Sequence, residues 1–97
     1  MRIAYTRRAV ADIVAIADYI KQHNPDAGLR VEQAIKRTIS YLASNPGLGI
    51  NRPDLGMRKI GVPRFAYSIY YRVGDAAIKI IHIRDERRRP LQEGDLS

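Results

Sequence analysis

Basic side chains gather in the stretch from Met57 to Arg89, MRKIGVPRFAYSIYYRVGDAAIKIIHIRDERRR. Nine lysines or arginines lie between Arg58 and Arg89 against three acidic residues, so this stretch carries most of the net charge of +7. A guanidinium binds a carboxylate or a phosphate through two parallel hydrogen bonds, which suits contacts with an acidic protein or a nucleic acid. The residues that we expect to contact a partner or target are Arg58, Tyr70, Arg72, Arg84, Arg87 and Arg88.

Each basic group also has a structural interpretation. Arg58 follows a glycine-rich loop, where it either anchors an acidic partner or forms an ion pair at a sheet edge. The arginines at residues 84 and 87–89 form either a binding surface or a solvated tail. Asp85 and Glu86 partly neutralise that cluster, which weakens the case for binding bare nucleic acid.

His82 is the histidine of this stretch, and a general acid or base needs a partner within hydrogen-bond reach. A single histidine in an apolar strand is more often structural, and we predict that role for His82. The sequence shows no metal-ligand cluster, phosphate-binding glycine loop or nucleophile triad, and it has no cysteine. We therefore expect no cofactor and no metal ion.

The elements that must position these side chains begin with a short strand at residues 2–5, followed by Thr6 as a helix N-cap. Apolar residues at helical spacing, among them Val10 and Val14, predict a helix over about residues 7–23. Asn24, followed by Pro25, predicts the start of a second helix that runs to about Ser44. Because the connection is so short, the two helices should form an antiparallel hairpin.

The glycine- and proline-rich segment at residues 45–56 predicts a loop without regular structure. Three strands should follow, with a two-residue turn at Gly74 and Asp75 between the second and the third. In the middle strand, Tyr67 and Tyr71 point to the face that we expect to lie under the helices. Tyr70 points the other way, towards a face that we expect to be free.

These elements predict a single α+β domain over residues 1–97. A helical hairpin packs on one face of a small, mainly antiparallel sheet, and the N-terminal strand joins an edge of that sheet. No apolar run approaches the roughly 20 residues of a membrane span, and no secretory signal is visible, so we expect a cytoplasmic protein without membrane contact.

The order and spacing of several segments resemble the RelE/ParE superfamily of type II toxin–antitoxin toxins. These segments are AVADIVAIADYI, the NPGLG helix end, MRKI, YSIYYRV and IIHIRDERR, and together they cover nearly the whole chain. The resemblance implies the α+β fold described above. It also implies a cognate antitoxin, encoded alongside the toxin, that wraps the toxin in a hetero-oligomer.

The superfamily divides into two branches. RelE-like toxins cleave messenger RNA on the ribosome, whereas ParE-like toxins act on DNA gyrase. The position of the RelE catalytic arginine holds Ser68 here, and a position that is often histidine holds Asp85. The resemblance therefore favours a ParE-like inhibitor of gyrase.

Two alternatives stay open. If the chain were a RelE-like endoribonuclease acting on the ribosome and its messenger RNA, the candidate catalytic residues would be Arg58, Tyr70 and Arg87, without a clear general base. The chain could also be a binding module that has lost its toxicity.

Overall fold

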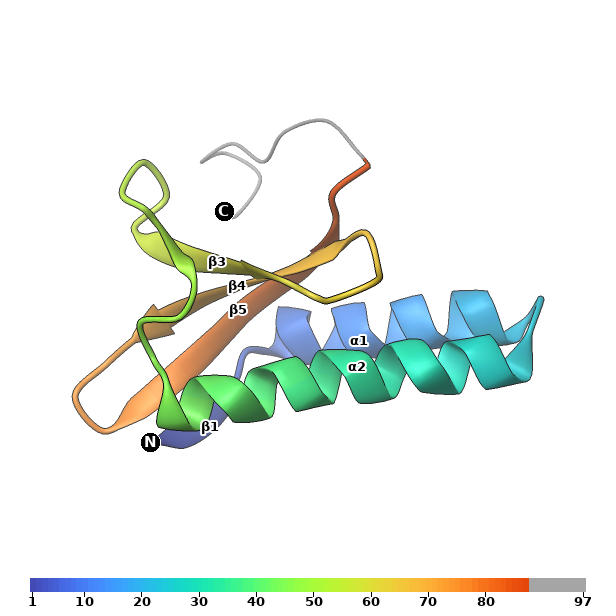
Figure 1. Ribbon diagram of the computed structural model, residues 1–97, viewed down its shortest axis with the longest axis horizontal. Helices are drawn as coiled ribbons and strands as arrows, with labels where there is room; N and C mark the ends of the chain where they lie inside the picture. The colour runs from blue at the N-terminus through green and yellow to red at the C-terminus, as the bar shows by residue number, and fades with distance from the viewer. Residues whose placement is uncertain (88–97) are drawn as a thin grey trace.

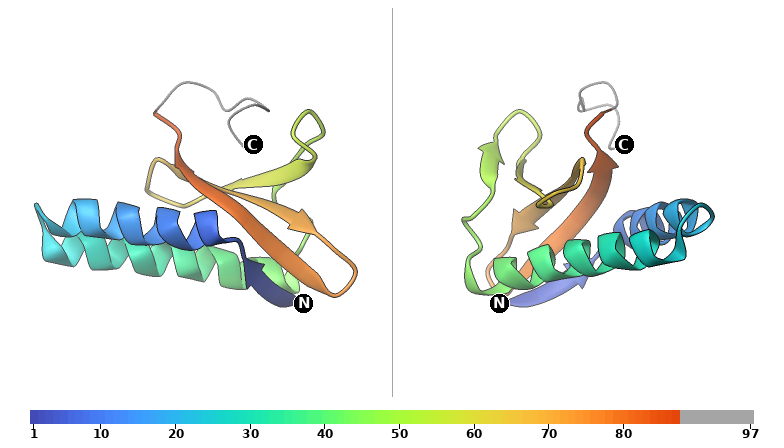
Figure 2. Two further views of the ribbon diagram at one scale, coloured as in Figure 1. Left: turned by 180° about the vertical axis from the view of Figure 1, so that it is seen from behind. Right: turned by 45° about the vertical axis from the view of Figure 1, so that its right-hand side comes forward.

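A computed structural model describes residues 1–87 of this chain. Two helices and five strands follow one another in the order β1 (Arg2–Tyr5), α1 (Arg7–Lys21), α2 (Pro25–Ser44), β2 (Ile50–Arg52), β3 (Met57–Gly61), β4 (Tyr67–Val73) and β5 (Ala77–Asp85). The helices lie side by side on one face of the sheet, and the far end of their hairpin projects beyond it (Figures 1 and 2). The predicted α+β fold is confirmed.

The five strands form one sheet in the order β1-β5-β4-β3-β2. β1 lies at an edge, as predicted, and pairs in parallel with β5, whereas the other three pairings are antiparallel. Two local predictions were wrong. The glycine-rich segment contains β2, whose three residues pair with β3, and the connection between β4 and β5 spans three residues instead of two.

The side chains predicted to cap the helices do so. Thr6 Oγ1 accepts a hydrogen bond from the N–H of Ala9 at 3.0 Å and donates one to the carbonyl of Ile81 at 2.9 Å, so one hydroxyl starts α1 and ties it to β5. Asn24 Oδ1 accepts from the N–H of Ala27 at 3.1 Å, with Pro25 in the first turn of α2.

The main core lies between the helices and the sheet. α1 contributes Ala9 and Ile13 to it, whereas Val10 and Val14 are about half exposed. The helix predicted from their spacing is present, but these two valines lie beside its buried stripe, which runs through Ala9, Ile13 and Ala17. Tyr67 and Tyr71 are buried in this core, which confirms their predicted position under the helices.

The opposite face of the sheet carries a second, smaller cluster made of Leu55, Met57 and Tyr70, with Ile81 packed against it. Leu55 belongs to the segment between β2 and β3, which folds back over this face. Tyr70 is only 1% exposed. The expectation that Tyr70 lies on a free face was wrong, because Leu55 and Met57 cover it.

Among residues 1–87, no helix is both long enough and apolar enough to cross a membrane.

Candidate functional site

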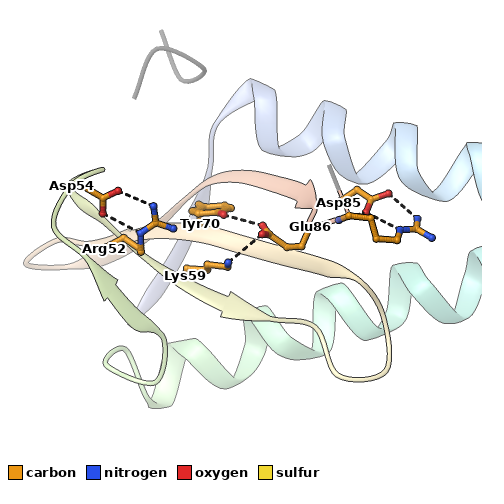
Figure 3. Close-up of polar contacts among 7 residues, drawn as sticks. Arg52, Asp54, Lys59, Tyr70, Asp85 and Glu86 are labelled. Carbon is orange, nitrogen blue, oxygen red and sulfur yellow. Dashed lines mark hydrogen bonds and ion pairs between the residues drawn. The ribbon is translucent and has the colours of Figure 1, made fainter. Parts of the chain in front are cut away.

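A tyrosine, a carboxylate and a lysine meet on the sheet face that points away from the helices (Figure 3). Tyr70 donates a hydrogen bond from Oη to Glu86 Oε1 at 2.8 Å, and Lys59 Nζ lies 3.1 Å from Glu86 Oε2. The Lys59 ammonium also lies 5.9 Å from the centre of the Tyr70 ring, within range of a cation–π contact. Both oxygens of Glu86 are therefore engaged.

The sheet register accounts for this cluster. Lys59 pairs directly with Tyr70 across β3 and β4, so their side chains project from the same face. Glu86 follows the end of β5, and its N–H donates to the carbonyl of Ala66 at 2.7 Å. This backbone hydrogen bond holds Glu86 at the end of the β4–β5 pair, where its carboxylate meets the Tyr70 hydroxyl.

Burial and the hydrogen bond to Glu86 raise the pKa of Tyr70 to about 12. The phenol therefore stays protonated at neutral pH and acts as a hydrogen-bond donor. It cannot accept a proton there as a general base.

Two further basic side chains of the sheet region are paired with acidic ones. Arg52 binds Asp54 through two hydrogen bonds of 3.0 and 2.7 Å, and Arg87 binds Asp85 through two of 2.9 and 2.7 Å. The hydrogen bond from Arg52 lowers the pKa of Asp54, and the bond to Asp85 raises the pKa of Arg87. The basic charge that the sequence concentrates here is thus partly neutralised within the molecule.

Arg58 makes a structural contact of a different kind from the predicted ion pair. Its Nη1 donates to the carbonyl of Gly49 at 2.8 Å, with a longer contact of 3.5 Å to the carbonyl of Gly47. Tyr71 holds the same loop, because its Oη accepts from the N–H of Gly49 at 2.8 Å and donates to the carbonyl of Pro46 at 2.9 Å. Arg58 and Tyr71 together fix the loop between α2 and β2.

Arg58 and Tyr70 lie on opposite faces of the sheet. Arg58 pairs with Tyr71, which points into the helix-side core, whereas Lys59 pairs with Tyr70 on the other side. Since side chains alternate along a strand, Arg58 and Tyr70 project in opposite directions. The structure therefore does not bring Arg58 to Tyr70.

Of the remaining predicted residues, Arg84 lies on the same sheet face as Tyr70, whereas Arg72 lies further along β4. Arg72 is exposed, and its Nε donates to the carbonyl of Gly56 at 3.1 Å. Arg84 is half buried in β5, opposite Ser68. Arg88 lies outside the described residues.

His82 has a partner that sequence reasoning missed. Its Nδ1 lies 2.6 Å from Asp12 Oδ2, and the same oxygen accepts from the N–H of Ile83 at 3.0 Å. β1 pairs with β5 only as far as Ile80, so Asp12 binds a strand amide just beyond that pairing. The sequence signal that could have indicated this partner was an acidic residue in the first turns of the helix that follows the edge strand.

In the Asp12–His82 pair the imidazole is buried, whereas the Asp12 carboxylate is partly exposed. His82 is 6% exposed, and its Nε2 is buried without a hydrogen-bond partner in the described part of the chain. The imidazole also stacks on Tyr70, with ring centres 6.2 Å apart. This arrangement supports the structural role predicted for His82, because no substrate reaches the free nitrogen. Within residues 1–87, no group of three histidine or acidic side chains is placed to hold a metal ion.

Comparison with known proteins places this chain in a family. The family profile described as "ParE toxin of type II toxin-antitoxin system, parDE" matches residues 3–90. The chain is 34% identical over 87 residues to a protein of Caulobacter vibrioides named Toxin RelE2, covering 90% of this chain and 97% of that protein. A solved structure described as the chromosomal ParDE TA system from P. aeruginosa has a TM-score of 0.77 and 30% identity, covering 88% of this chain and 95% of that one. This chain therefore belongs to the ParE toxin family of type II toxin–antitoxin systems.

Proposed function

We propose that this ParE-family toxin acts in the cytoplasm by binding and inhibiting a protein target, and that the target is DNA gyrase. The toxin performs no catalysis of its own. A cognate antitoxin holds it inactive in a hetero-oligomer. Membership of the ParE family and the similarity to a chromosomal ParDE system support this proposal.

The observation that carries the proposal is the separation of Arg58 from Tyr70. Cleavage of RNA at the 2′-hydroxyl needs a base, a proton donor and positive charge around one phosphate. Arg58 and Tyr70 lie on opposite faces of the sheet, and Arg58 is bound to the loop carbonyl of Gly49. The candidate ribonuclease residues therefore cannot converge on one phosphate in this conformation.

A second candidate function is RelE-like cleavage of messenger RNA, and one observation favours it. Lys59, Tyr70 and Glu86 bring a cation, a proton donor and a carboxylate together on one face. The relative from Caulobacter vibrioides also carries the name Toxin RelE2. Against this function, both oxygens of Glu86 are engaged and the Tyr70 phenol has a pKa of about 12.

The experiment is induction of the protein without antitoxin, followed by pulse labelling of DNA and protein synthesis. We expect DNA synthesis to stop first with messenger RNA intact, and the purified protein to inhibit supercoiling by gyrase. Glu86→Gln and Tyr70→Phe should keep this toxicity, since neither removes an exposed contact. The exposed arginines are the proposed target contacts, so Arg72→Ala and Arg87→Ala should weaken gyrase inhibition.

The opposite pattern would overturn the proposal. Early arrest of translation, with transcripts cut at codons and cutting abolished by Glu86→Gln, would establish the ribonuclease function. Normal growth at confirmed expression of folded protein would show that the chain is a binding module without toxicity.

A further inference from the structure

Three exposed basic side chains lie on the strands beside the β4–β5 turn. Arg72 of β4 pairs directly with Lys79 of β5, and Arg2 of β1 pairs with Ala77, two residues before Lys79. The β4–β5 turn and the projecting end of the helical hairpin lie at opposite ends of the described chain (Figures 1 and 2). We call Arg2, Arg72 and Lys79 the basic patch.

The three side chains of the basic patch point to the same face of the sheet, the one away from the helices. Their neighbours Ile3, Tyr71 and Ile80 pack in or against the helix-side core, and side chains alternate along a strand. The residues paired with the patch on β1 and β5 include Ala4 and Ala77. Alanine side chains are too short to act as the apolar or aromatic anchors on which protein partners dock.

The charge of the basic patch is not neutralised within the described part of the chain. Among residues 1–87, no carboxylate forms an ion pair with Arg2, Arg72 or Lys79. Like charges that lie directly opposite each other in a sheet, as Arg72 and Lys79 do, destabilise it. On the same face, by contrast, Lys59 has Glu86 at 3.1 Å. An exposed repulsive pair of cations is typical of a surface that binds an anion.

A backbone contact orients the Arg72 side chain. Its Nε donates to the carbonyl of Gly56 at 3.1 Å, and its guanidinium makes no other hydrogen bond within residues 1–87. The two terminal nitrogens therefore keep their N–H donors for a ligand. Gly56 has a φ of 66°, so the accepting carbonyl belongs to a turn that favours glycine.

We propose that the basic patch binds the phosphate backbone of duplex DNA. A duplex carries one negative charge per about 1.7 Å of its axis, and neighbouring strands of a sheet lie about 5 Å apart, so cations on the adjacent strands β1, β5 and β4 face several phosphates. Guanidinium and ammonium groups bind phosphate without reading bases, so this contact is independent of sequence. The inference rests on the proposed function for the source of the DNA, which is the duplex held by gyrase.

The first test uses purified toxin and a fluorescently labelled DNA duplex, with binding measured by anisotropy over a range of salt concentrations. Each phosphate contact contributes about 0.9 to the slope of log affinity against log salt, so Arg72→Ala and Lys79→Ala should each lower that slope by about one. Between about 50 and about 200 mM salt, the ratio of wild-type to variant affinity should then shrink about three- to fourfold. A duplex of unrelated sequence should give the same result.

Charge variants separate DNA binding from folding. Lys79→Glu replaces a repulsive cross-strand pair with an attractive one, so we expect its melting temperature to rise by roughly 2–8 °C. The same variant should bind the duplex more weakly than Lys79→Gln, which only removes the positive charge. Arg72→Lys keeps the charge and should keep the salt slope. Arg30→Ala is the matched control, because it removes one exposed positive charge on α2 and should leave the slope unchanged.

Several results would overturn the inference. An unchanged salt slope in both alanine variants would remove the basic patch from the DNA contact, and an equal loss of slope in Arg30→Ala would show only an effect of net charge. A lower melting temperature for Lys79→Glu would contradict the repulsion between Arg72 and Lys79. Tighter binding of a single-stranded oligoribonucleotide, weakened in the same variants, would assign the patch to RNA.

A supercoiling assay with gyrase distinguishes failure of this inference from failure of the proposed function. If wild-type toxin binds the duplex through the basic patch but does not inhibit gyrase, the proposed function fails and the DNA site stands. If wild-type toxin inhibits gyrase and Lys79→Glu inhibits it equally well, the inference fails and the proposed function stands. We expect wild-type toxin to inhibit gyrase and Lys79→Glu to inhibit it more weakly.

Discussion

Gly49 is a position where one added methyl group should destabilise the fold strongly. A Cβ built on Gly49 would lie 2.6 Å from Tyr71 Oη and 2.8 Å from the carbonyl oxygen of Lys59. Tyr71 is fully buried and its hydroxyl bonds both Gly49 and Pro46, so the ring has no room to move. Gly49→Ala must therefore displace the loop, the tyrosine or both.

The cost follows from these contacts. Forcing an extra methyl group into a packed site costs about 1–3 kcal/mol, and weakening two hydrogen bonds costs about 0.5–1.5 kcal/mol each. We expect Gly49→Ala to lower the unfolding free energy by about 2–6 kcal/mol, a large part of the roughly 5–15 kcal/mol typical of a domain. At about 4–8 °C per kcal/mol, the melting temperature should fall by at least ~8 °C.

Gly47→Ala is the matched control, because a Cβ on Gly47 meets no atom within 4 Å. It should be neutral or stabilise by up to about 1 kcal/mol through the unfolded chain. Urea unfolding followed by circular dichroism compares the two variants. If the unfolding midpoints of Gly49→Ala and Gly47→Ala coincide, the proposed clamp of Tyr71 on the loop is refuted.

Two further predictions concern the buried polar contacts. Asp12→Ala leaves His82 Nδ1 and the N–H of Ile83 without their acceptor, so it should lower the unfolding free energy by about 2–5 kcal/mol. Asp18→Ala, at an exposed position of the same helix, should stay within about 0.5 kcal/mol in the same urea titration, and equal losses would contradict the role of Asp12. The Tyr70 phenol keeps its proton until about pH 12 in the folded state but loses it near pH 10 in the unfolded state. Its contribution to the free energy of unfolding is therefore complete below pH 10 and is lost towards pH 12. The free energy of unfolding of Tyr70→Phe should therefore depend less on pH in this range than that of the wild type or of Tyr41→Phe, the control at an exposed position. Identical pH profiles would contradict the role given to Tyr70.

The two faces of the sheet differ in how their charges are paired. Around Tyr70, on the face away from the helices, Glu86 neutralises Lys59 and binds Tyr70, which makes a rigid, internally satisfied cluster. On the helix side, Arg37 and Arg64 lack such partners among residues 1–87.

Sequence reasoning was most successful where the cause is local. Thr6 and Asn24 cap helices because a short polar side chain reaches an amide three residues away in the same segment. The alternation of Tyr67 and Tyr71 with their neighbours predicted which side of β4 enters the main core. The order of these local segments was also enough to indicate the toxin family.

Only the tertiary structure decided which distant side chains meet. Asp12 binds His82 and Tyr70 binds Glu86 across many intervening residues, and no periodicity in the sequence encodes either pair. Strand register placed Arg58 and Tyr70 on opposite faces, a result that a shift of one residue would reverse. Local patterns determine which elements form, because caps and periodicity act within a few residues. Register and packing determine which charges are neutralised and which remain available for a partner, because these depend on contacts between elements far apart in the chain.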